Sequence, residues 1–257
     1  MSASPPKVTV ENRPRGVVTV TLSRPEKSNA LDREMLGLLA GAIAEAERDS
    51  ATRVLVLRAA GKHFCAGADL SSSASDGSAS GPTIVDVCML LSRSTKPSIA
   101  VVHGACIGGG LALAACCDIL LAASDAFFTI PEVRLGFAPG PLTAFFMQAI
   151  PPRALRRYLI SGERIPADRA LMLGLAHEVA AQEKIEATLD AVVEALLQGG
   201  PGAIGDGKRI LRECEELPLT RQTLDRLGAD FDRRIRSPEA LEGLASMREK
   251  RRPKWYP

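Results

Sequence analysis

The stretch over residues 104–118, GACIGGGLALAACCD, constrains the fold more than any other part of the sequence. It follows an apolar run at 98–102 that is typical of a buried strand. Glycine weakens helix and strand interiors, so three glycines in a row indicate a turn or a group that approaches the backbone closely. We therefore expect a strand, a glycine turn and a helix over residues 109–116. Such a turn presents unpaired N–H groups at the positive end of a helix, which suits an anion.

A second turn of small residues, HFCAGADL at 63–70, follows another predicted strand at 54–58. Two such turns can each direct one backbone N–H at the same oxygen atom. This pairing favours an oxyanion site over the alternative for the glycines, which is tight packing of a helix on a strand. A third feature is Glu132, a carboxylate in the apolar stretch FFTIPEVRLGF. Burial would raise the pKa of this carboxyl and suit it to proton transfer. The alternative interpretation of Glu132 is an ordinary glutamate in a surface loop.

Composition excludes several functional classes. The net charge of +2 and the 4% of aromatic residues argue against a nucleic-acid partner. The N-terminus has no apolar core typical of a signal peptide, and no uninterrupted apolar run is long enough to span a membrane. Six cysteines without a C-x-x-C pair, and only three histidines, predict reduced thiols and no metal site. We expect a cytoplasmic protein with no membrane partner.

Strands alternate with helices in the first half of the chain, and helices dominate after Pro141. This order predicts an α/β layered core followed by a helical region. The Ser/Gly-rich segment at 71–81 predicts a mobile surface loop, in a place where a lid could lie. The expected strands are 17–22, 54–58, 98–102, 119–122 and 127–130. The expected helices are 32–48, 109–116, 142–150, 153–160, 166–173, 184–198, 203–215, 219–235 and 238–249.

From about Val8 to Trp255, the chain resembles the crotonase superfamily, the enoyl-CoA hydratase/isomerase family. The motifs that carry the resemblance are LSRPEKSNALD (22–32), HFCAGADL (63–70), GACIGGGLALAACCDI (104–119), FTIPEVRLGF (128–137), GLAHEVA (174–180) and EGLASMREKRRPKW (242–255). The resemblance implies an α/β crotonase (ClpP-like) spiral of repeated ββα units with a helical C-terminal region. It further implies a core over residues 1–195 and a trimerisation region over 196–257, in a homotrimer or a dimer of trimers (a hexamer).

The resemblance also implies the roles of particular residues toward an acyl-CoA thioester, with no cofactor apart from the coenzyme A of the substrate. The backbone N–H groups of Ala68 and Gly109 would bind the thioester oxygen, and Glu132 would be the acid/base. Donors fixed in advance stabilise an enolate more than the neutral thioester. The implied substrate contacts, which along residues 27–31 and 66–70 are backbone contacts, are Lys27, Asn29, Ala30, Leu31, Ala66, Gly67, Ala68, Asp69, Leu70, Gly108 and Gly109. Lys27 and the basic tail at 250–252 could meet the CoA phosphates, and the alternative for the tail is a solvated basic end. Phe137, Phe145, Phe146 and Met147 suggest an apolar acyl site or core packing, with pocket walls expected from the 71–95 segment and from the helices near 141–150.

One position departs from the family pattern. Hydratases of this family usually carry a first glutamate where this chain has Ala112, so addition of water by two glutamates is in doubt. Asp118 is expected to be structural, as a cap at the helix end, and not to replace it. Three hypotheses follow: a hydratase-type lyase with a single glutamate, acting on a branched or glutaconyl-type enoyl-CoA; an enoyl-CoA delta-isomerase; and a non-catalytic acyl-CoA-binding scaffold. The enzymatic hypotheses place the protein in fatty-acid and lipid metabolism.

Overall fold

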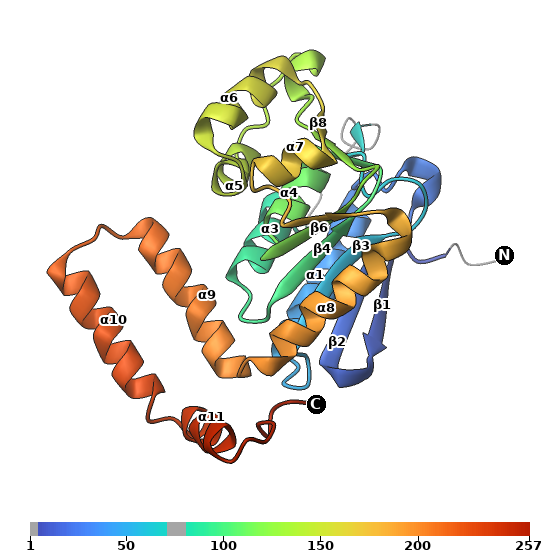
Figure 1. The fold of residues 1–257 in the computed structure, drawn as a ribbon. Helices are drawn as coiled ribbons and strands as arrows, with labels where there is room; N and C mark the ends of the chain where they lie inside the picture. Colours follow the sequence, from blue (N-terminus) through green and yellow to red (C-terminus); the bar gives the residue numbers. More distant parts are fainter. Residues whose placement is uncertain (1–4, 71–80) are drawn as a thin grey trace.

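The computed structural model describes residues 5–70 and 81–257. Its main feature is a six-stranded sheet in the order β1-β2-β3-β4-β6-β9 (Figure 1). Strand β1 is antiparallel to β2, and the remaining neighbours are parallel. The strands are β1 (Val8–Arg13), β2 (Val17–Leu22), β3 (Val54–Ala59), β4 (Ser98–Val102), β6 (Ile119–Ala123) and β9 (Glu178–Ala180).

Helices cover both faces of this sheet, which explains why its central strands are almost wholly apolar. Side chains alternate between the faces. Val20 and Leu57 pack in one core with α1 (Arg33–Arg48) and α3 (Ile84–Arg93). Val56 and Val101 pack in a second core with α8 (Ile185–Gln198). The sheet is therefore the rigid support for the loops at its edge.

A small second sheet lies beside these loops, in the order β5-β7-β8. It consists of β5 (Ala105–Ile107), β7 (Phe127–Thr129) and β8 (Ile165–Pro166). Helix α4 (Gly109–Ala115) follows β5 directly, and the 3-10 helix η3 (Glu132–Leu135) follows β7. Since β5 and β7 pair in parallel, the glycine turn after one strand and the glutamate after the other leave the same sheet edge.

The C-terminal half is helical, as predicted. Its helices α5 (Leu142–Ala149), α6 (Pro152–Ser161) and α7 (Ala167–Met172) pack against the core, and α9 (Pro201–Glu216), α10 (Arg221–Arg234) and α11 (Pro238–Arg248) extend from it as an arm (Figure 1). Helices α9 and α10 bury none of their residues. The tail returns to α8, where Trp255 donates to the Gln198 oxygen at 3.1 Å. The predicted boundary at residue 195 falls inside α8, and the two-domain division stays a prediction.

The five predicted strands and nine predicted helices are all present, with ends that differ by at most two residues. The prediction lacked β1, β5, β8, β9 and α3. Strand β1 reads VTVENR and, among the described strands, pairs only with β2. Four of its six residues are exposed, so it has no apolar run to reveal it. The expected loop and lid at 71–81 lie outside the described residues except for Gly81.

Candidate active site

A cavity of about 370 Å³ opens where the two glycine turns meet η3. Its wall is mainly apolar, and the ionisable side chains in its lining are Asp32, Arg33 and Glu132. The sequence-predicted site residues in the lining are Leu31, Ala66, Gly67, Ala68, Leu70, Gly108, Gly109 and Glu132. The structure thus brings eight of the predicted residues together around one space. Their roles toward a substrate stay predictions.

The two turns are joined by backbone pairing. Cys65 and Cys106 form a parallel bridge, and the Ile107 N–H donates to the Cys65 oxygen at 2.9 Å. Gly67 has a φ of +92°, and a Cβ there would lie 3.2 Å from the Ile107 oxygen and 3.9 Å from the Gly109 nitrogen. The first turn therefore passes directly over the amide that begins α4. A side chain at Gly67 would be strained and would crowd this approach.

The amides of Ala68 and Gly109 are two free donors at this junction. Neither donates a hydrogen bond to another group in the described part of the chain. Gly109 begins α4, so its N–H has no partner within the helix and lies at the positive helix end. Ala68 forms a parallel β-bridge with Leu31. The hydrogen bonds of this bridge are made by the backbone groups of the residues on either side of Ala68, for example by the Gly67 oxygen, which accepts from the Leu31 N–H at 2.8 Å. Both donors belong to residues that line the cavity.

Glu132 places a carboxylate beside these donors. Its side chain is buried, with 9% exposure, and its Oε2 atom has no hydrogen-bond partner among the described residues. Burial raises the pKa of this carboxyl above its ordinary value of 4.5. Gly108, with a φ of +49°, makes room for the carboxylate: a Cβ at this position would lie 2.5 Å from Glu132 Oε1. The position of the Glu132 carboxyl therefore requires a residue without a side chain at position 108.

Four of the predicted contacts lie outside the cavity lining: Lys27, Asn29, Ala30 and Asp69. Asn29 is fully buried, and its amide donates to the Ala60 and His63 oxygens at 2.8 Å each. The Asn29 side chain therefore stabilises its own loop. Lys27 is exposed.

Asp69 belongs to a partly buried ionic network. Arg24 Nη1 lies 2.7 Å from Asp69 Oδ2 and 3.2 Å from Asp32 Oδ2, and it donates to the Ala30 oxygen at 3.1 Å. Asp32 in turn caps α1 by accepting from the Met35 N–H at 2.9 Å. Arg24 thus joins the start of α1 to the turn that carries Ala68.

Replacing this arginine should loosen the turn. We expect Arg24→Met to lower the free energy of unfolding by about 1–3 kcal/mol, because Asp69 and Asp32 would both lose a nearly buried cationic partner. Urea unfolding at neutral pH measures the change. Arg13→Met, which removes a more exposed pair with Glu11, is the matched control and should alter stability by less than about 1 kcal/mol. Equal effects of the two substitutions would contradict the structural role of Arg24.

The sequence placed the cavity walls in the 71–95 segment and in the helices near 141–150, but it did not identify the residues that form them. Thr83 and Ile84 at the start of α3 line the cavity, and so do Leu135, Pro139 and Leu142 near η3 and α5. These residues read as ordinary core or loop positions, so no signal in the sequence marks them. Of the four residues suggested for an apolar acyl site, Phe137 lines the cavity. Phe145 and Phe146 pack in the core and Met147 is 46% exposed.

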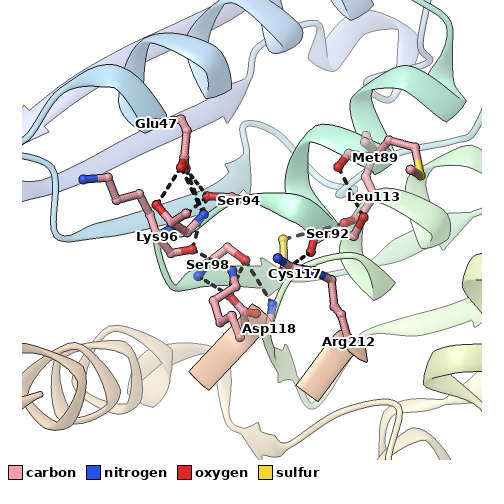
Figure 2. A network of polar contacts seen from close by, with 12 residues as sticks. Glu47, Met89, Ser92, Ser94, Lys96, Ser98, Leu113, Cys117, Asp118 and Arg212 are labelled. Carbon is pink, nitrogen blue, oxygen red and sulfur yellow. Dashed lines mark hydrogen bonds and ion pairs between the residues drawn. The ribbon is translucent and has the colours of Figure 1, made fainter. Parts of the chain in front are cut away.

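Ala112 and Asp118 lie on α4 and beyond its end. Ala112 is fully buried, one helical turn after Gly108, so α4 presents no carboxylate there. Asp118 is bonded to Ser98 (Figure 2): its Oδ2 atom accepts from the Ser98 N–H at 2.7 Å and from Ser98 Oγ at 2.8 Å. Lys208 of α9 donates to the same carboxylate at 2.6 Å. Asp118 is therefore structural, as expected, although it joins β4 and α9 and does not cap α4.

The comparison with known proteins agrees with this geometry. The enoyl-CoA hydratase/isomerase family model matches residues 12–257. The chain belongs to the enoyl-CoA hydratase/isomerase family. It is 32% identical over 245 residues to a probable enoyl-CoA hydratase of Mycobacterium leprae, covering 93% of this chain and 96% of that one. It is 30% identical over 248 residues to a carnitinyl-CoA dehydratase of Salmonella typhi, with 93% and 94% coverage.

Solved structures share the whole fold with this chain. Pseudomonas aeruginosa AtuE superposes with a TM-score of 0.91 at 30% identity, covering 98% of this chain and 100% of that one. An enoyl-CoA hydratase from Shewanella pealeana superposes with a TM-score of 0.90 at 30% identity, with 97% and 96% coverage. The predicted crotonase fold is confirmed, and the chain is an enzyme of this family.

Two further observations concern the described residues alone. No helix among them is long and apolar enough to cross a membrane. They hold no group of three His, Cys, Asp or Glu side chains arranged to bind a metal ion.

Proposed function

We propose that the protein hydrates an enoyl-CoA thioester, using a thioester oxyanion site and Glu132 as a single acid/base. One observation carries the proposal: in a mainly apolar cavity, the buried Glu132 carboxyl, whose Oε2 atom has no hydrogen-bond partner among the described residues, lies against the turn that presents the Gly109 amide. The backbone amides of Ala68 and Gly109 would bind the thioester oxygen. Coenzyme A belongs to the substrate in this proposal, and no separate cofactor takes part.

The residues would act in two steps. The Glu132 carboxylate takes a proton from water, and the oxygen of that water forms a bond to carbon 3 of the enoyl group. The π electron pair moves to the thioester oxygen, where the two amides stabilise the enolate. The enolate then collapses, and carbon 2 takes the proton from Glu132. Protons and electrons balance, and the carboxylate is regenerated.

A delta-isomerase is the second candidate, and the buried Ala112 favours it. An isomerase needs one base, because the same carboxylate removes a proton from one carbon and returns it to another two bonds away through the same enolate. A non-catalytic acyl-CoA-binding scaffold is the third. The Ala68 and Gly109 amides and the Glu132 carboxylate argue against a scaffold, since a protein that only binds acyl-CoA requires none of these groups.

A panel of enoyl-CoA thioesters separates these functions. Hydration removes the absorbance of the conjugated enoyl thioester, isomerisation of a 3-enoyl thioester creates it, and a scaffold binds without any change. The panel should include straight, branched and glutaconyl-type acyl groups, because a branched or glutaconyl-type substrate is part of the proposal. We expect water addition. A shift of the double bond without water addition would establish the isomerase instead.

The dependence of activity on pH should reflect the ionisation of Glu132. In either reaction the residue begins as a carboxylate, so activity falls when it is protonated. Because burial raises its pKa, we expect the acid limb of kcat/KM to lie above pH 4.5, the ordinary value for a glutamate. Initial rates between pH 4 and 9 measure this limb. An acid limb at or below 4.5 would contradict a buried glutamate as the base.

We further propose assembly into a homotrimer or a dimer of trimers. The arm supports this proposal, since α9 and α10 bury no residue, and Leu224 and Phe231 of α10 are more than half exposed. A cytoplasmic location and a part in fatty-acid metabolism remain predictions.

A further inference from the structure

The carboxyl of Glu132 has to be held by its backbone. Its Oε2 atom has no hydrogen-bond partner in the described part of the chain, so no neighbouring side chain fixes that oxygen. The segment after β7 carries it, as the first residue of η3. A general acid/base must be placed within a fraction of an ångström to be effective. What fixes this segment therefore bears directly on the chemistry.

Two side chains that flank Glu132 attach the segment to the end of α6. Thr129, three residues before Glu132, donates from Oγ1 to the Gly162 oxygen at 3.1 Å. Arg134, two residues after Glu132, donates from Nε to the Ser161 oxygen at 3.1 Å. We call these two hydrogen bonds the α6 contacts. They join consecutive carbonyl oxygens of one turn to both sides of the acid/base.

The end of α6 is a firm support. Gly162 has a φ of +61° and closes the helix by donating to the Tyr158 oxygen at 2.9 Å. Tyr158 and Leu155 anchor the helix in the core. The chain then enters β8, which pairs with β7, the strand that leads to Glu132. Carbonyl oxygens at a helix end have no partner within the helix, so the α6 contacts also satisfy two such groups.

The same segment is tied to the oxyanion turn. The Thr129 carbonyl oxygen accepts from the Gly108 N–H at 3.0 Å, and Gly108 immediately precedes the proposed donor Gly109. Thr129 thus contacts the end of α6 through its side chain and the glycine turn through its backbone. At Gly162, a Cβ would lie 2.9 Å from Arg134 Nε, so the arginine lies directly on the turn. These contacts link the α6 end, the acid/base and the oxyanion turn in one connected unit.

We propose that Thr129 and Arg134 are positioning residues that hold Glu132 against Gly108 through the α6 contacts. The proposal rests on the proposed function, in which Glu132 transfers the proton. Neither side chain lines the cavity, so neither is proposed to touch the substrate. Their effect should therefore appear in the chemical step and not in binding.

The test compares substitutions that remove or keep one donor. Thr129→Val keeps the shape of the side chain and removes its hydroxyl. We expect kcat to fall about tenfold with KM within about twofold of the native value, because Glu132 loses its alignment and the cavity wall is unchanged. Thr129→Ser keeps the donor and should restore most of the rate. Arg134→Met keeps the aliphatic part of the side chain over Gly162 and changes an exposed residue, so the variant should fold. It should show the same fall in kcat with a nearly unchanged KM.

A matched control addresses simple loss of stability. Thr19 on β2 is also buried, but its Oγ1 has no hydrogen-bond partner among the described residues. Thr19→Val is therefore the same chemical change without a lost contact. It should leave kcat, KM and the pH profile as they are.

The pH profile of activity gives a second test of positioning, because the loss of a threonine with only a structural role would not change this profile. The other ionisable groups in the cavity lining, Asp32 and Arg33, lie at the start of α1 and keep their surroundings in these variants. We expect the acid limb in Thr129→Val and Arg134→Met to move toward the ordinary glutamate value, because a loosened segment admits water to the carboxyl. Thr129→Ser should keep the native limb.

The outcomes separate the positioning role from the proposed function. A large loss of rate in Glu132→Gln, with native kcat and pH profile in Thr129→Val and Arg134→Met, would overturn the positioning role alone. Unchanged activity in Glu132→Gln would instead overturn the proposed function. A rise in KM without a fall in kcat would also contradict the proposal, because it would place the two residues in binding.

Discussion

Glu132→Gln is expected to lower kcat by about a thousandfold while the fold is retained. The amide has nearly the volume of the carboxyl, so the buried site keeps its shape, but it cannot accept and return a proton. General acid–base groups contribute about 10² to 10⁴ in rate, and this residue would serve as both acid and base. Steady-state kinetics on the best thioester of the substrate panel, together with a thermal unfolding curve, measures both parts of the expectation.

Glu186→Gln is the control for the loss of one negative charge. Glu186 is an exposed residue of α8 that pairs with Arg58, outside the cavity lining. Its substitution should leave kcat within about twofold of the native value, since exposed ion pairs contribute little. Equal rates in the native protein and Glu132→Gln would remove this carboxyl from the mechanism.

Gly108→Ala should have the second-largest effect. A Cβ at this position would lie 2.5 Å from Glu132 Oε1, and the φ of +49° is one that an alanine rarely adopts. The methyl group must therefore displace the carboxyl or shift the turn that precedes Gly109. We expect kcat/KM to fall by about a hundredfold or more, since displacement of about 1 Å has an effect of that size. The backbone strain should lower the free energy of unfolding by about 1–3 kcal/mol.

The control for Gly108→Ala separates strain from displacement. Gly174 has a φ of +76°, and a Cβ there would meet no atom within 4 Å. Gly174→Ala should therefore produce a similar loss of stability with little loss of activity, as measured by urea unfolding and initial rates. If both variants lost activity to the same extent, the effect of Gly108→Ala would come from instability and not from contact with Glu132.

The sequence predicted the parts of the site that local chemistry marks. Three consecutive glycines and the CAGAD turn are unfavourable in regular structure, so they indicated where the backbone is approached closely, and the structure places both turns on one cavity. Glu132 stood out as a charge within an apolar stretch, and it is buried. The central strands were predictable because parallel strands covered on both faces are almost wholly apolar.

Other features depend on contacts between distant segments. The Asn29 side chain bonds to the chain around Ala60 and the Asp69 side chain pairs with Arg24, which the sequence did not reveal, while the predicted backbone contacts of these residues with a substrate stay predictions. The cavity wall from α3 depends on how that helix crosses the glycine turn, which periodicity does not give. Thr129 is an ordinary strand residue in the sequence, and only the return of β8 beside β7 brings it to the end of α6.

A crystal structure of the protein with a non-reacting acyl-CoA thioester bound is the most direct test of the proposed oxyanion site. We expect the thioester oxygen to lie about 2.7–3.1 Å from both the Ala68 and the Gly109 nitrogen atoms, with carbon 2 facing the Glu132 carboxyl. A thioester oxygen that meets neither amide, or a Glu132 carboxyl directed away from the acyl group, would contradict this proposal.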